Sequence, residues 1–325
     1  MHAGTCAAMR RVAIAALLAC AEPAPAAAQA PPIAVRDGDG WRGLWRPDSI
    51  APAQWPRGDV ALRESLNWQR GRDGVSWAEL PLRGDGEAWR TRAIIVRIDP
   101  SRVRIRLDTA FTRVRDAHGA VMRRAAWHIG QAARPAILAV NAGQFAATVL
   151  GTLPWGWVVL EGREWRPPGI GPLSTAIVID SGGGVRLLSP NALESPLRMR
   201  GVRFAFQSFP SLLEGDGNVP TPLQAGTGAV DHTHRDARLA LGTLRDGSML
   251  LVMTRFDVFG RVLGAVPFGL TTPEMAALMG ALGCARAVML DGGISAQMQL
   301  RTAAGALQRW PGWRSVPLGL VIEPR

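Results

Sequence analysis

Two stretches of the sequence place polar side chains and glycines directly after a hydrophobic run. In the first, the apolar residues 287–290 lead into Asp291, Gly292 and Gly293, and Ser295 follows. A carboxylate at the end of a buried strand can act as a base or a nucleophile, and glycine lets backbone N–H groups approach an anion closely. Asp-Gly is also an ordinary turn former. The motif alone therefore leaves two interpretations open, a tight turn and an active site.

The second stretch repeats this order. Residues 136–140 are apolar, and Asn141 and Gly143 follow them. The ends of strands in α/β sheets are places where ligand-binding groups gather. Asn-x-Gly, like Asp-Gly, is also an ordinary turn former, so each motif alone is a weak signal.

The composition narrows the chemistry that such a site can use. All 37 basic residues are arginine, because the sequence contains neither lysine nor tyrosine. A lysine Schiff base, an amine nucleophile and a tyrosine acid or base are therefore excluded. Asp, Glu, His, Ser, Thr, Cys and Arg remain as candidates.

The net charge of +11 is compatible with several anionic partners. Its arginines are scattered along the chain and form no basic block, and no motif interleaves aromatic with basic residues. We therefore expect no nucleic-acid partner. An anionic polysaccharide, a phosphorylated ligand or a membrane surface remains compatible with this charge.

Residues 1–30 have the order of residues that is typical of a secretory signal peptide. Arg10 and Arg11 precede the apolar residues 12–21, and a stretch of small residues follows. The apolar run is shorter than the roughly 20 residues that a spanning helix needs. We expect a periplasmic or secreted protein. The alternative is a lipoprotein anchored through Cys20, which would be its one contact with a membrane.

The remaining chain divides into two predicted regions. Residues 31–75 form an arm rich in Trp, Arg and Pro, whose tryptophans are expected to pack on the neighbouring domain or, alternatively, to bind sugars. Residues 76–325 form the main domain. Cys284 is the one cysteine beyond the leader, so no internal disulfide is expected and we interpret it as a core residue.

The main domain is predicted to be of the α+β class, strand-rich, with mixed sheets and a few packing helices. Alternating or continuous apolar runs predict strands at residues 93–96 and 103–107 around a turn at Asp99. Two further hairpins are expected at residues 157–160 with a turn at Glu161, and at 239–253 with a turn at Asp246. Strands are also expected at 175–180 and 316–322.

Two helices have recognisable signals. The first begins at Thr271, with Pro273 and Glu274 in its first turn, and Gly283 ends it. Glu274 is therefore interpreted first as a helix-start carboxylate. A second helix is expected at residues 125–134, before Pro135.

The order of these motifs resembles the phosphodiester glycosidase domain family. The resemblance rests on NAGQF at residues 141–145, RLALG at 238–242, a helix opening at 269–274, LDGGIS at 290–295 and a closing strand that starts with Val316 and Pro317. It covers residues 76–325. Ala142, Gln144 and Ile294 stand where family members usually carry other residues.

The resemblance implies an exported hydrolase of α-linked sugar 1-phosphodiesters or related envelope glycans, including exopolysaccharides. It implies Asp291 as base or nucleophile and Arg238 as the phosphate clamp, since the planar guanidinium pairs with phosphate oxygens. Asn141 and Ser295 would orient sugar hydroxyls, and the backbone near Gly143, Gly292 and Gly293 would line the substrate. No cofactor is implied.

Glycoside cleavage normally uses two carboxylates, and the sequence leaves the second one open. Asp236, Asp257 and Glu274 are all candidates. The neighbouring His232 and His234 could suggest a metal site, but two ligands at this spacing do not make a closed one. We interpret them as part of a polar loop and predict no metal.

Two functions from other classes compete with the glycosidase. The altered NAGQF and DGGIS motifs would also suit a non-catalytic polysaccharide-binding or assembly factor on the same scaffold. A protease or esterase with Ser295 as nucleophile is disfavoured, because DGGIS lacks the Gly-x-Ser-x-Gly order and no histidine follows it. The sequence does not predict an oligomeric state.

Overall fold

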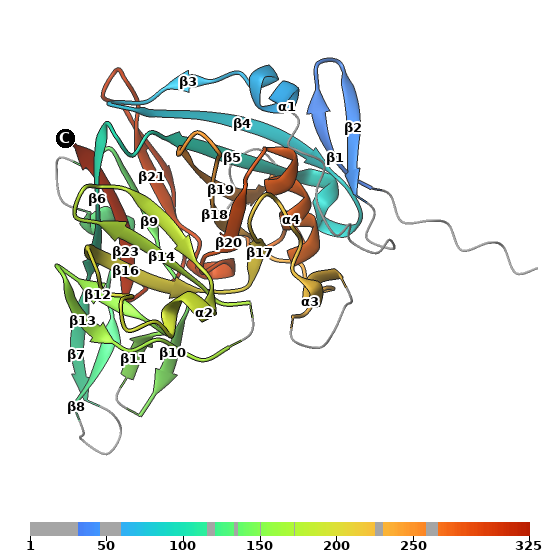
Figure 1. The fold of residues 1–325 in the computed structure, drawn as a ribbon. Helices are drawn as coiled ribbons and strands as arrows, with labels where there is room; N and C mark the ends of the chain where they lie inside the picture. Colours follow the sequence, from blue (N-terminus) through green and yellow to red (C-terminus); the bar gives the residue numbers. More distant parts are fainter. Residues whose placement is uncertain are drawn as a thin grey trace, which may run out of the picture. The chain divides into compact units, whose positions relative to one another are not determined.

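The computed structural model describes residues 32–45, 60–115, 121–132, 136–149, 151–171, 173–224, 230–257 and 266–325 (Figure 1). The predicted leader, with Cys20, lies outside these residues. No helix in the described ranges has the length and hydropathy that a membrane crossing requires. Residues 31–325 form one compact unit.

A nine-stranded antiparallel sheet carries the DGG motif. Its strands, in spatial order, are β17 (Ser211–Leu213), β20 (Arg286–Met289), β18 (Leu239–Thr243), β19 (Met249–Phe256), β5 (Thr91–Ile98), β4 (Val75–Arg83), β1 (Ile33–Asp37) and β2 (Gly40–Trp45), with β3 (Gln69–Arg70) also paired to β4. β20 lies between β17 and β18, so the DGG motif leaves the sheet from a strand that is paired on both sides.

A second antiparallel sheet, here called the β9 sheet, carries the NAGQF motif. Its order is β22 (Leu307–Trp310), β21 (Met298–Arg301), β9 (Leu138–Asn141), β23 (Leu318–Pro324) and β6 (Val103–Thr109). The chain passes from β20 through the DGG motif directly into β21. That motif therefore connects the two sheets that bear the predicted site residues.

Two smaller sheets complete the described part. The β16 sheet has the order β13 (Arg163–Arg166), β12 (Val158–Leu160), β16 (Val202–Ser208), β14 (Thr175–Asp180) and β15 (Val185–Leu188). The β8 sheet has the order β10 (Phe145–Thr148), β11 (Gly151–Pro154), β8 (Val121–Ala125) and β7 (Phe111–Arg115). In the β8 sheet, β8 and β11 are parallel.

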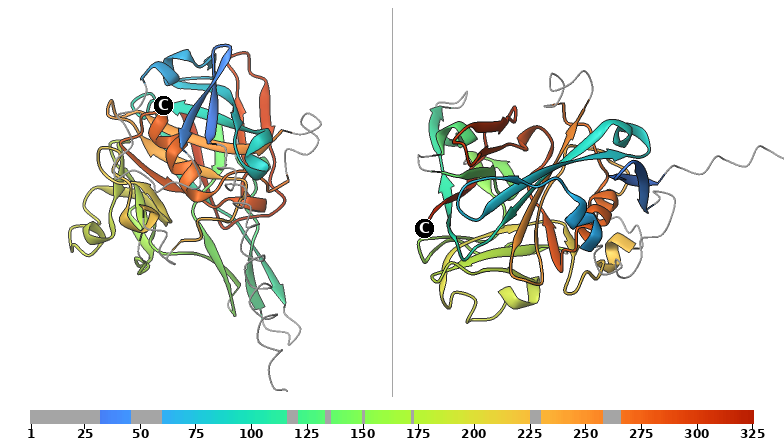
Figure 2. Two further views of the ribbon diagram at one scale, coloured as in Figure 1. Left: turned by 90° about the vertical axis from the view of Figure 1, so that its right-hand side faces the viewer. Right: turned by 90° about the horizontal axis from the view of Figure 1, so that it is seen from above.

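The central strands of the nine-stranded sheet, β5, β19, β18 and β20, are buried on both faces because they are apolar at successive positions. On β5, Ile94 and Val96 pack with side chains of the β9 and β16 sheets. Ala93 and Ile95 point to the other face, which packs against α4 (Thr272–Ala281) and α1 (Val60–Ser65). Figure 2 shows α4 in orange alongside this sheet.

The start signals predicted for α4 are confirmed. Thr271 is the N-cap, its hydroxyl accepts from the Glu274 N–H, and the Glu274 carboxylate accepts from the Thr271 N–H. Gly283, with φ +85°, follows the C-cap Leu282. The helix is buried around its whole circumference and does not present a single apolar face.

The fold class is confirmed only in its strand-rich part. Apart from α4, the described α-helices are single short turns: α1, α2 (Pro190–Leu193) and α3 (Thr221–Gln224). The fold is therefore mostly β, and the α+β label fits loosely.

The hairpins predicted at residues 157–160 and 239–253 are confirmed as β12–β13 and β18–β19, and the strands predicted at 175–180 and 316–322 correspond to β14 and β23. The prediction that the strands at residues 93–96 and 103–107 form a hairpin is wrong. β5 and β6 are both strands, but β5 pairs with β4 and β19, whereas β6 pairs with β23. The turn at Asp99 carries the chain from one sheet to another.

The helix predicted at residues 125–134 is also wrong. Val121–Ala125 is β8, and helical structure is limited to the 3₁₀ turn η2 (Ile129–Gln131), while residues 133–135 lie outside the described ranges. Trp127 exchanges two backbone hydrogen bonds with Val316. The Ile129 N–H donates to the Gln297 side chain, so tertiary contacts override the local helix signal.

Within the predicted N-terminal arm, β1, β2 and β3 belong to the nine-stranded sheet, and Asp37 and Gly40 pair across the β1–β2 hairpin. The division of the chain at residues 30 and 75 stays a prediction. Cys284 is a buried core residue, as expected, and burial raises the pKa of its thiol to about 12.

Candidate active site

The DGG loop is held by backbone contacts to both sheets that flank it. The Asp291 N–H donates to the Ala142 carbonyl at 3.1 Å, and the Gly293 N–H donates to the Ala237 carbonyl at 2.7 Å. A Cβ on Gly292 would lie 2.7 Å from the Ala237 carbonyl oxygen, so a side chain does not fit there. The loop then turns through η3 (Gly293–Ser295), where Gly293 has φ +57°.

Asp291 is partly buried, and its carboxylate has an unusual balance of interactions. Its Oδ2 is buried and has no hydrogen-bond partner among the described residues. Burial raises the pKa of Asp291 from its ordinary value of 3.8 to about 6. A hydrogen bond with the Ser295 side chain and the charge of Arg314 lower this pKa, and the charge of Asp236 raises it.

Asp236 is the second carboxylate of the site. A Cβ added to Gly293 would lie 2.7 Å from Asp236 Oδ2, which places this carboxylate directly against the DGG loop. Its Oδ1 accepts from the Ala237 N–H at 2.8 Å, and its Oδ2 lies 3.7 Å from His234 Nε2. Burial raises the pKa of Asp236, opposed most strongly by the nearby charge of Arg238.

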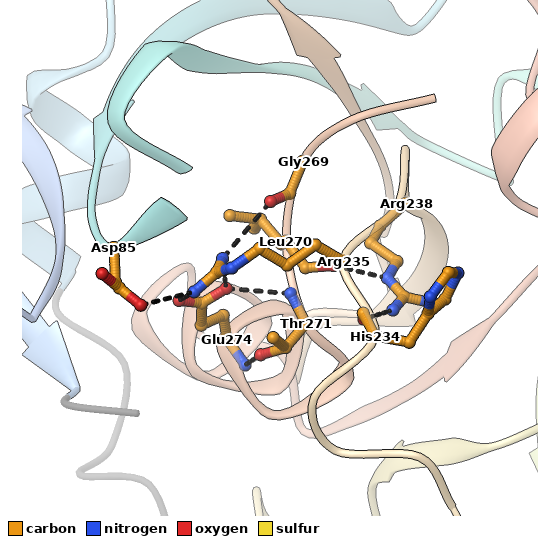
Figure 3. A network of polar contacts seen from close by, with 8 residues as sticks. All are labelled: Asp85, His234, Arg235, Arg238, Gly269, Leu270, Thr271 and Glu274. Atoms are coloured by element: carbon orange, nitrogen blue, oxygen red, sulfur yellow. Dashed lines mark hydrogen bonds and ion pairs between the residues drawn. The ribbon is translucent and has the colours of Figure 1, made fainter. Parts of the chain in front are cut away.

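Glu274 is engaged elsewhere, as its helix-start position predicted (Figure 3). Its carboxylate is fully buried, caps α4 and pairs with both Nη atoms of Arg235 at 2.7 and 3.0 Å. The backbone of Asp257, the third candidate, is bound to the segment before β5: its N–H donates to the Arg90 carbonyl at 2.6 Å. Of the three candidates, Asp236 is the one that the structure brings to Asp291.

Arg238 holds the polar loop in place, as Figure 3 shows. Its Nε donates to the Leu270 carbonyl at 2.7 Å, and its Nη2 donates to the His234 carbonyl. Burial lowers the pKa of this guanidinium, and Asp236 is the largest charge that opposes the shift. The guanidinium therefore positions the Asp236 segment, and its role as phosphate clamp stays a prediction.

Asn141 occupies a positioning role in the structure. The side chain is fully buried, Nδ2 donates to the Asp291 carbonyl at 2.7 Å, and Oδ1 accepts from the Gln297 N–H at 2.9 Å. Both polar atoms are thus used to join β9 to the two ends of the DGG loop. The role of Asn141 in orienting a sugar hydroxyl stays a prediction.

The glycines predicted to line the substrate also have structural partners. The Gly293 N–H donates to the Ala237 carbonyl, and a role of Gly293 at the substrate stays a prediction. A Cβ on Gly143 would lie 2.5 Å from the Gln207 carbonyl oxygen, so Gly143 is needed where β9 leaves its sheet beside β16. Ser295 is buried and contacts Asp291 rather than an open surface.

A cleft of about 650 Å³ opens beside Asp236. Its lining residues are Thr233, His234, Arg235, Asp236, Pro267, Phe268 and Ile294. It combines one carboxylate, a histidine and a guanidinium with two exposed apolar side chains, Phe268 and Ile294. Such a mixture of apolar surface and a few convergent polar groups is typical of a small-molecule site.

The family model described as phosphodiester glycosidase matches residues 134–323, more than half of the chain. The chain belongs to the phosphodiester glycosidase family. This match contains Asn141, Asp236, Arg238 and Asp291, so the paired carboxylates lie within the family domain. No curated protein matches the sequence.

Two solved structures resemble this phosphodiester glycosidase domain. The catalytic domain of zebrafish N-acetylglucosamine-1-phosphodiester alpha-N-acetylglucosaminidase, auto-inhibited by its pro-peptide, is 16% identical with a TM-score of 0.51; 86% of this chain and 96% of that chain are covered. A hypothetical protein from Synechocystis is 14% identical with a TM-score of 0.47 and 78% of this chain covered. The match spans 62% of the Synechocystis chain. The zebrafish likeness shows the fold.

Two departures from the usual family motif have clear structural settings. The Gln144 side chain accepts from the Ser208 hydroxyl at 2.7 Å and from the Phe209 N–H at 3.1 Å, so it ties the NAGQF loop to the end of β16. Ile294 is 40% exposed and lines the cleft beside Asp236. The first change is accommodated by hydrogen bonds within the protein, whereas the second places an exposed apolar side chain in the wall of this cleft.

Two arginines near the phosphodiester glycosidase site were not predicted. Arg255, on β19, is buried and donates to the carbonyls of Ala296, Trp310 and Pro311, which fixes the chain where it leaves η3. Burial lowers the pKa of Arg255 to about 10. Arg314 follows the β9-sheet strand β22 and acts on Asp291 through its charge. In a chain with 37 scattered arginines, neither position carries a local signal.

The two histidines of the polar loop are placed separately. His232 Nε2 lies 3.1 Å from the Pro222 carbonyl, whereas His234 approaches Asp236. In the described ranges, His, Cys, Asp and Glu side chains do not gather in threes as a metal site would require.

Proposed function

We propose that the protein is a hydrolase that cleaves the glycosidic bond of α-linked sugar 1-phosphodiesters, with Asp291 and Asp236 as its two carboxylates. The observation that carries the proposal is their pairing. Both carboxyl groups have a raised pKa. Asp291 belongs to the DGG loop, and Asp236 lies against that loop and lines a cleft of about 650 Å³. Paired carboxylates in different environments are the usual apparatus of glycoside hydrolysis.

Asp291 has the properties of the base or nucleophile. Above pH 6 it is mostly ionised, and its Oδ2 has no hydrogen bond within the described residues that would reduce its basicity. A carboxylate in this state can attack an anomeric carbon or accept a proton from water. The phosphate monoester that leaves when the sugar C1–O bond breaks is already a good leaving group, so the reaction depends less on a strong acid than ordinary glycoside cleavage does.

Asp236 stands at the cleft beside a histidine and the positive charge of two arginines. His234 and Arg238 lie beside its carboxylate, and Arg235 lines the same cleft. A substrate phosphate in the cleft would meet this positive charge while its sugar faces the carboxylates. The exposed Ile294 and Phe268 give the sugar or the aglycone an apolar surface.

The test is release of free sugar from a panel of α-sugar 1-phosphodiesters that includes a nucleotide sugar. We expect the wild-type protein to release sugar and Asp291→Asn and Asp236→Asn to lose at least about 100-fold in rate. Asp216→Asn is the matched control, because Asp216 is an exposed carboxylate with φ +58°, a conformation that asparagine tolerates. Full turnover by a folded Asp291→Asn variant would refute the assignment.

The same panel separates the main alternative. A non-catalytic polysaccharide-binding or assembly factor would bind glycan without release of sugar, and Asp291→Asn would not change that binding. The exposed Ile294 in the altered DGGIS motif is the observation that favours this alternative. Absence of turnover by an intact wild-type protein would support it.

We infer from the sequence of residues 1–30 that the protein acts in the periplasm or outside the cell, with lipid anchoring through Cys20 as the alternative. The mass of the mature N-terminus distinguishes these cases. A peptide that begins near residue 29 or 31 would support cleavage by signal peptidase, whereas an acylated Cys20 would support the lipoprotein. An unprocessed Met1 would contradict both.

A further inference from the structure

A second cleft lies on another side of the DGG loop, between the β8 sheet and the segment that follows β22. It has a volume of about 470 Å³. Its lining residues are Arg124, Ala125, Phe145, Thr152, Trp313, Arg314 and Ser315. None of these residues lines the cleft that contains Asp236.

The charge of this second cleft is positive and is not neutralised by its own lining. Arg124 and Arg314 are both exposed, and none of the described residues that line the cleft is acidic. Within the described ranges, no ion pair or hydrogen bond involves either guanidinium. Two guanidiniums that form no ion pair with the lining of one concave site attract an anion, because each can pair with carboxylate or phosphate oxygens.

Arg314 is held in a defined orientation. Its guanidinium carbon lies 4.4 Å from the centre of the Phe145 ring. Stacking on an aromatic face uses the flat side of the guanidinium and leaves its N–H edges available for an anion. The backbone on either side is fixed as well, since the Arg314 and Trp313 N–H groups both donate to the Ile294 carbonyl.

The remaining lining residues suit a sugar ring. Trp313 is 62% exposed, although a tryptophan usually buries most of its large apolar surface. Two residues that carry hydroxyls, Thr152 and Ser315, also line this cleft. An aromatic platform for the apolar face of a ring, with hydroxyls at its edge, matches the amphipathic surface of a saccharide.

We propose that the cleft of Arg124, Phe145, Thr152, Trp313, Arg314 and Ser315 is a binding site for an acidic saccharide unit, whose carboxylate or phosphate is held by the two arginines and whose ring lies on Trp313. If the proposed hydrolase function holds, this cleft is a subsite that binds a further unit of the same glycan. The Ile294 carbonyl connects it to the DGG loop, and Arg314 acts electrostatically on Asp291. The binding itself does not require turnover.

Calorimetric titration of the Asp291→Asn protein tests the proposal without hydrolysis. The probes are a hexasaccharide of alternating glucuronic acid and N-acetylglucosamine, glucose 6-phosphate, and neutral chitohexaose. We expect the acidic hexasaccharide or the sugar phosphate to bind more tightly than chitohexaose, and to lose affinity as salt is raised. Comparison of the two acidic probes shows whether carboxylate or phosphate is the preferred anion.

Substitutions then locate the site. In the Asp291→Asn background, we expect Trp313→Ala and Arg314→Gln each to weaken binding of the acidic probe by about 10-fold or more. Arg104→Gln is the matched control, because Arg104 is an exposed arginine on β6 outside the cleft. A neutral probe that binds as well as the acidic ones, or acidic binding that survives both substitutions, would overturn the proposal.

The two proposals can fail separately. Turnover of a small phosphodiester without binding of any acidic probe would leave the hydrolase function and remove this site. If an acidic probe binds in a way that depends on Trp313 but the wild-type protein shows no turnover, the saccharide site would stand and the hydrolase function would be refuted.

Discussion

At the scale of single residues, the main feature is that the predicted catalytic carboxylate is energetically costly where it lies. Asp291 has a buried oxygen without a partner in the described residues, and burial raises its pKa to about 6. When the pKa of a carboxyl group is higher in the folded than in the unfolded protein, its ionisation lowers the free energy of unfolding. Such a cost is common at functional sites, where stability is exchanged for reactivity.

This cost predicts a pH-dependent gain in stability for Asp291→Asn. Below pH 3.8 the aspartic acid is protonated in the folded and the unfolded protein, so the substitution has little effect. As pH rises through 6, Asp291 ionises in the folded wild-type protein and its burial lowers the free energy of unfolding. The neutral asparagine side chain has no such penalty, so the variant becomes more stable than wild type by about 1–3 kcal/mol. Denaturant unfolding at pH 4 and pH 7.5 measures the difference. A variant that is less stable than wild type at pH 7.5 would contradict the buried-charge account.

Asp291, Gly292 and Gly293 could be predicted from sequence because a local pattern marks them: a polar residue and glycines at the end of an apolar strand. The partner carboxylate could not. Asp236, Asp257 and Glu274 are equally plausible from sequence, and the choice depends on the approach of Asp236 to Gly293 across the fold. The sequence indicated that Asn141 lies at the end of a strand. It did not indicate the two backbone groups that the Asn141 side chain binds, because they lie about 150 residues away along the chain.

At the scale of elements, α4 supports the site through a buried ion pair. Glu274 caps the helix and pairs with Arg235, and the backbone of the next residue, Asp236, exchanges two hydrogen bonds with Leu270. The start of α4, the ion pair and the second carboxylate are thereby connected through adjacent contacts in the fold. The capping box was readable from sequence, but the Arg235 pair depends on a contact across 39 residues.

This arrangement predicts that two substitutions in one capping box differ strongly. Thr271→Ala removes a cap and should cost about 1 kcal/mol of stability. Glu274→Gln can keep the capping-box acceptor but removes the buried carboxylate that pairs most closely with the largely buried Arg235, and should cost about 3–5 kcal/mol. Thermal or urea unfolding of both variants provides the comparison. Equal effects would show that the ion pair adds nothing beyond the cap.

The predicted elements that failed did so for non-local reasons. Residues 93–107 do contain two strands around a turn, but the pairing partners of β5 and β6 come from distant parts of the chain. The helix signal at 125–134 lost to contacts with Val316 and Gln297. Propensity and periodicity describe a segment, whereas strand pairing is decided by the assembly of sheets.

At the scale of the whole described domain, the site exists because the DGG motif joins two sheets. It leaves the nine-stranded sheet at β20 and enters the β9 sheet at β21, while Ala142 and Ala237 bind it from either side. The apolar cores on both sides explain the burial that raises the pKa of Asp291. Sequence alone indicated the strand-rich class and the family motifs, but not this junction.

The central claim, that Asp291 acts as an ionised base or nucleophile, is tested most directly by the pH dependence of sugar release. Because its pKa is about 6, kcat/KM for a sugar 1-phosphodiester should rise about tenfold for each pH unit below 6 and level off above it. The Asp216→Asn control should show the same profile. A kcat/KM that instead falls as pH rises through 6 would contradict the claim, because it would require the protonated form of the carboxyl.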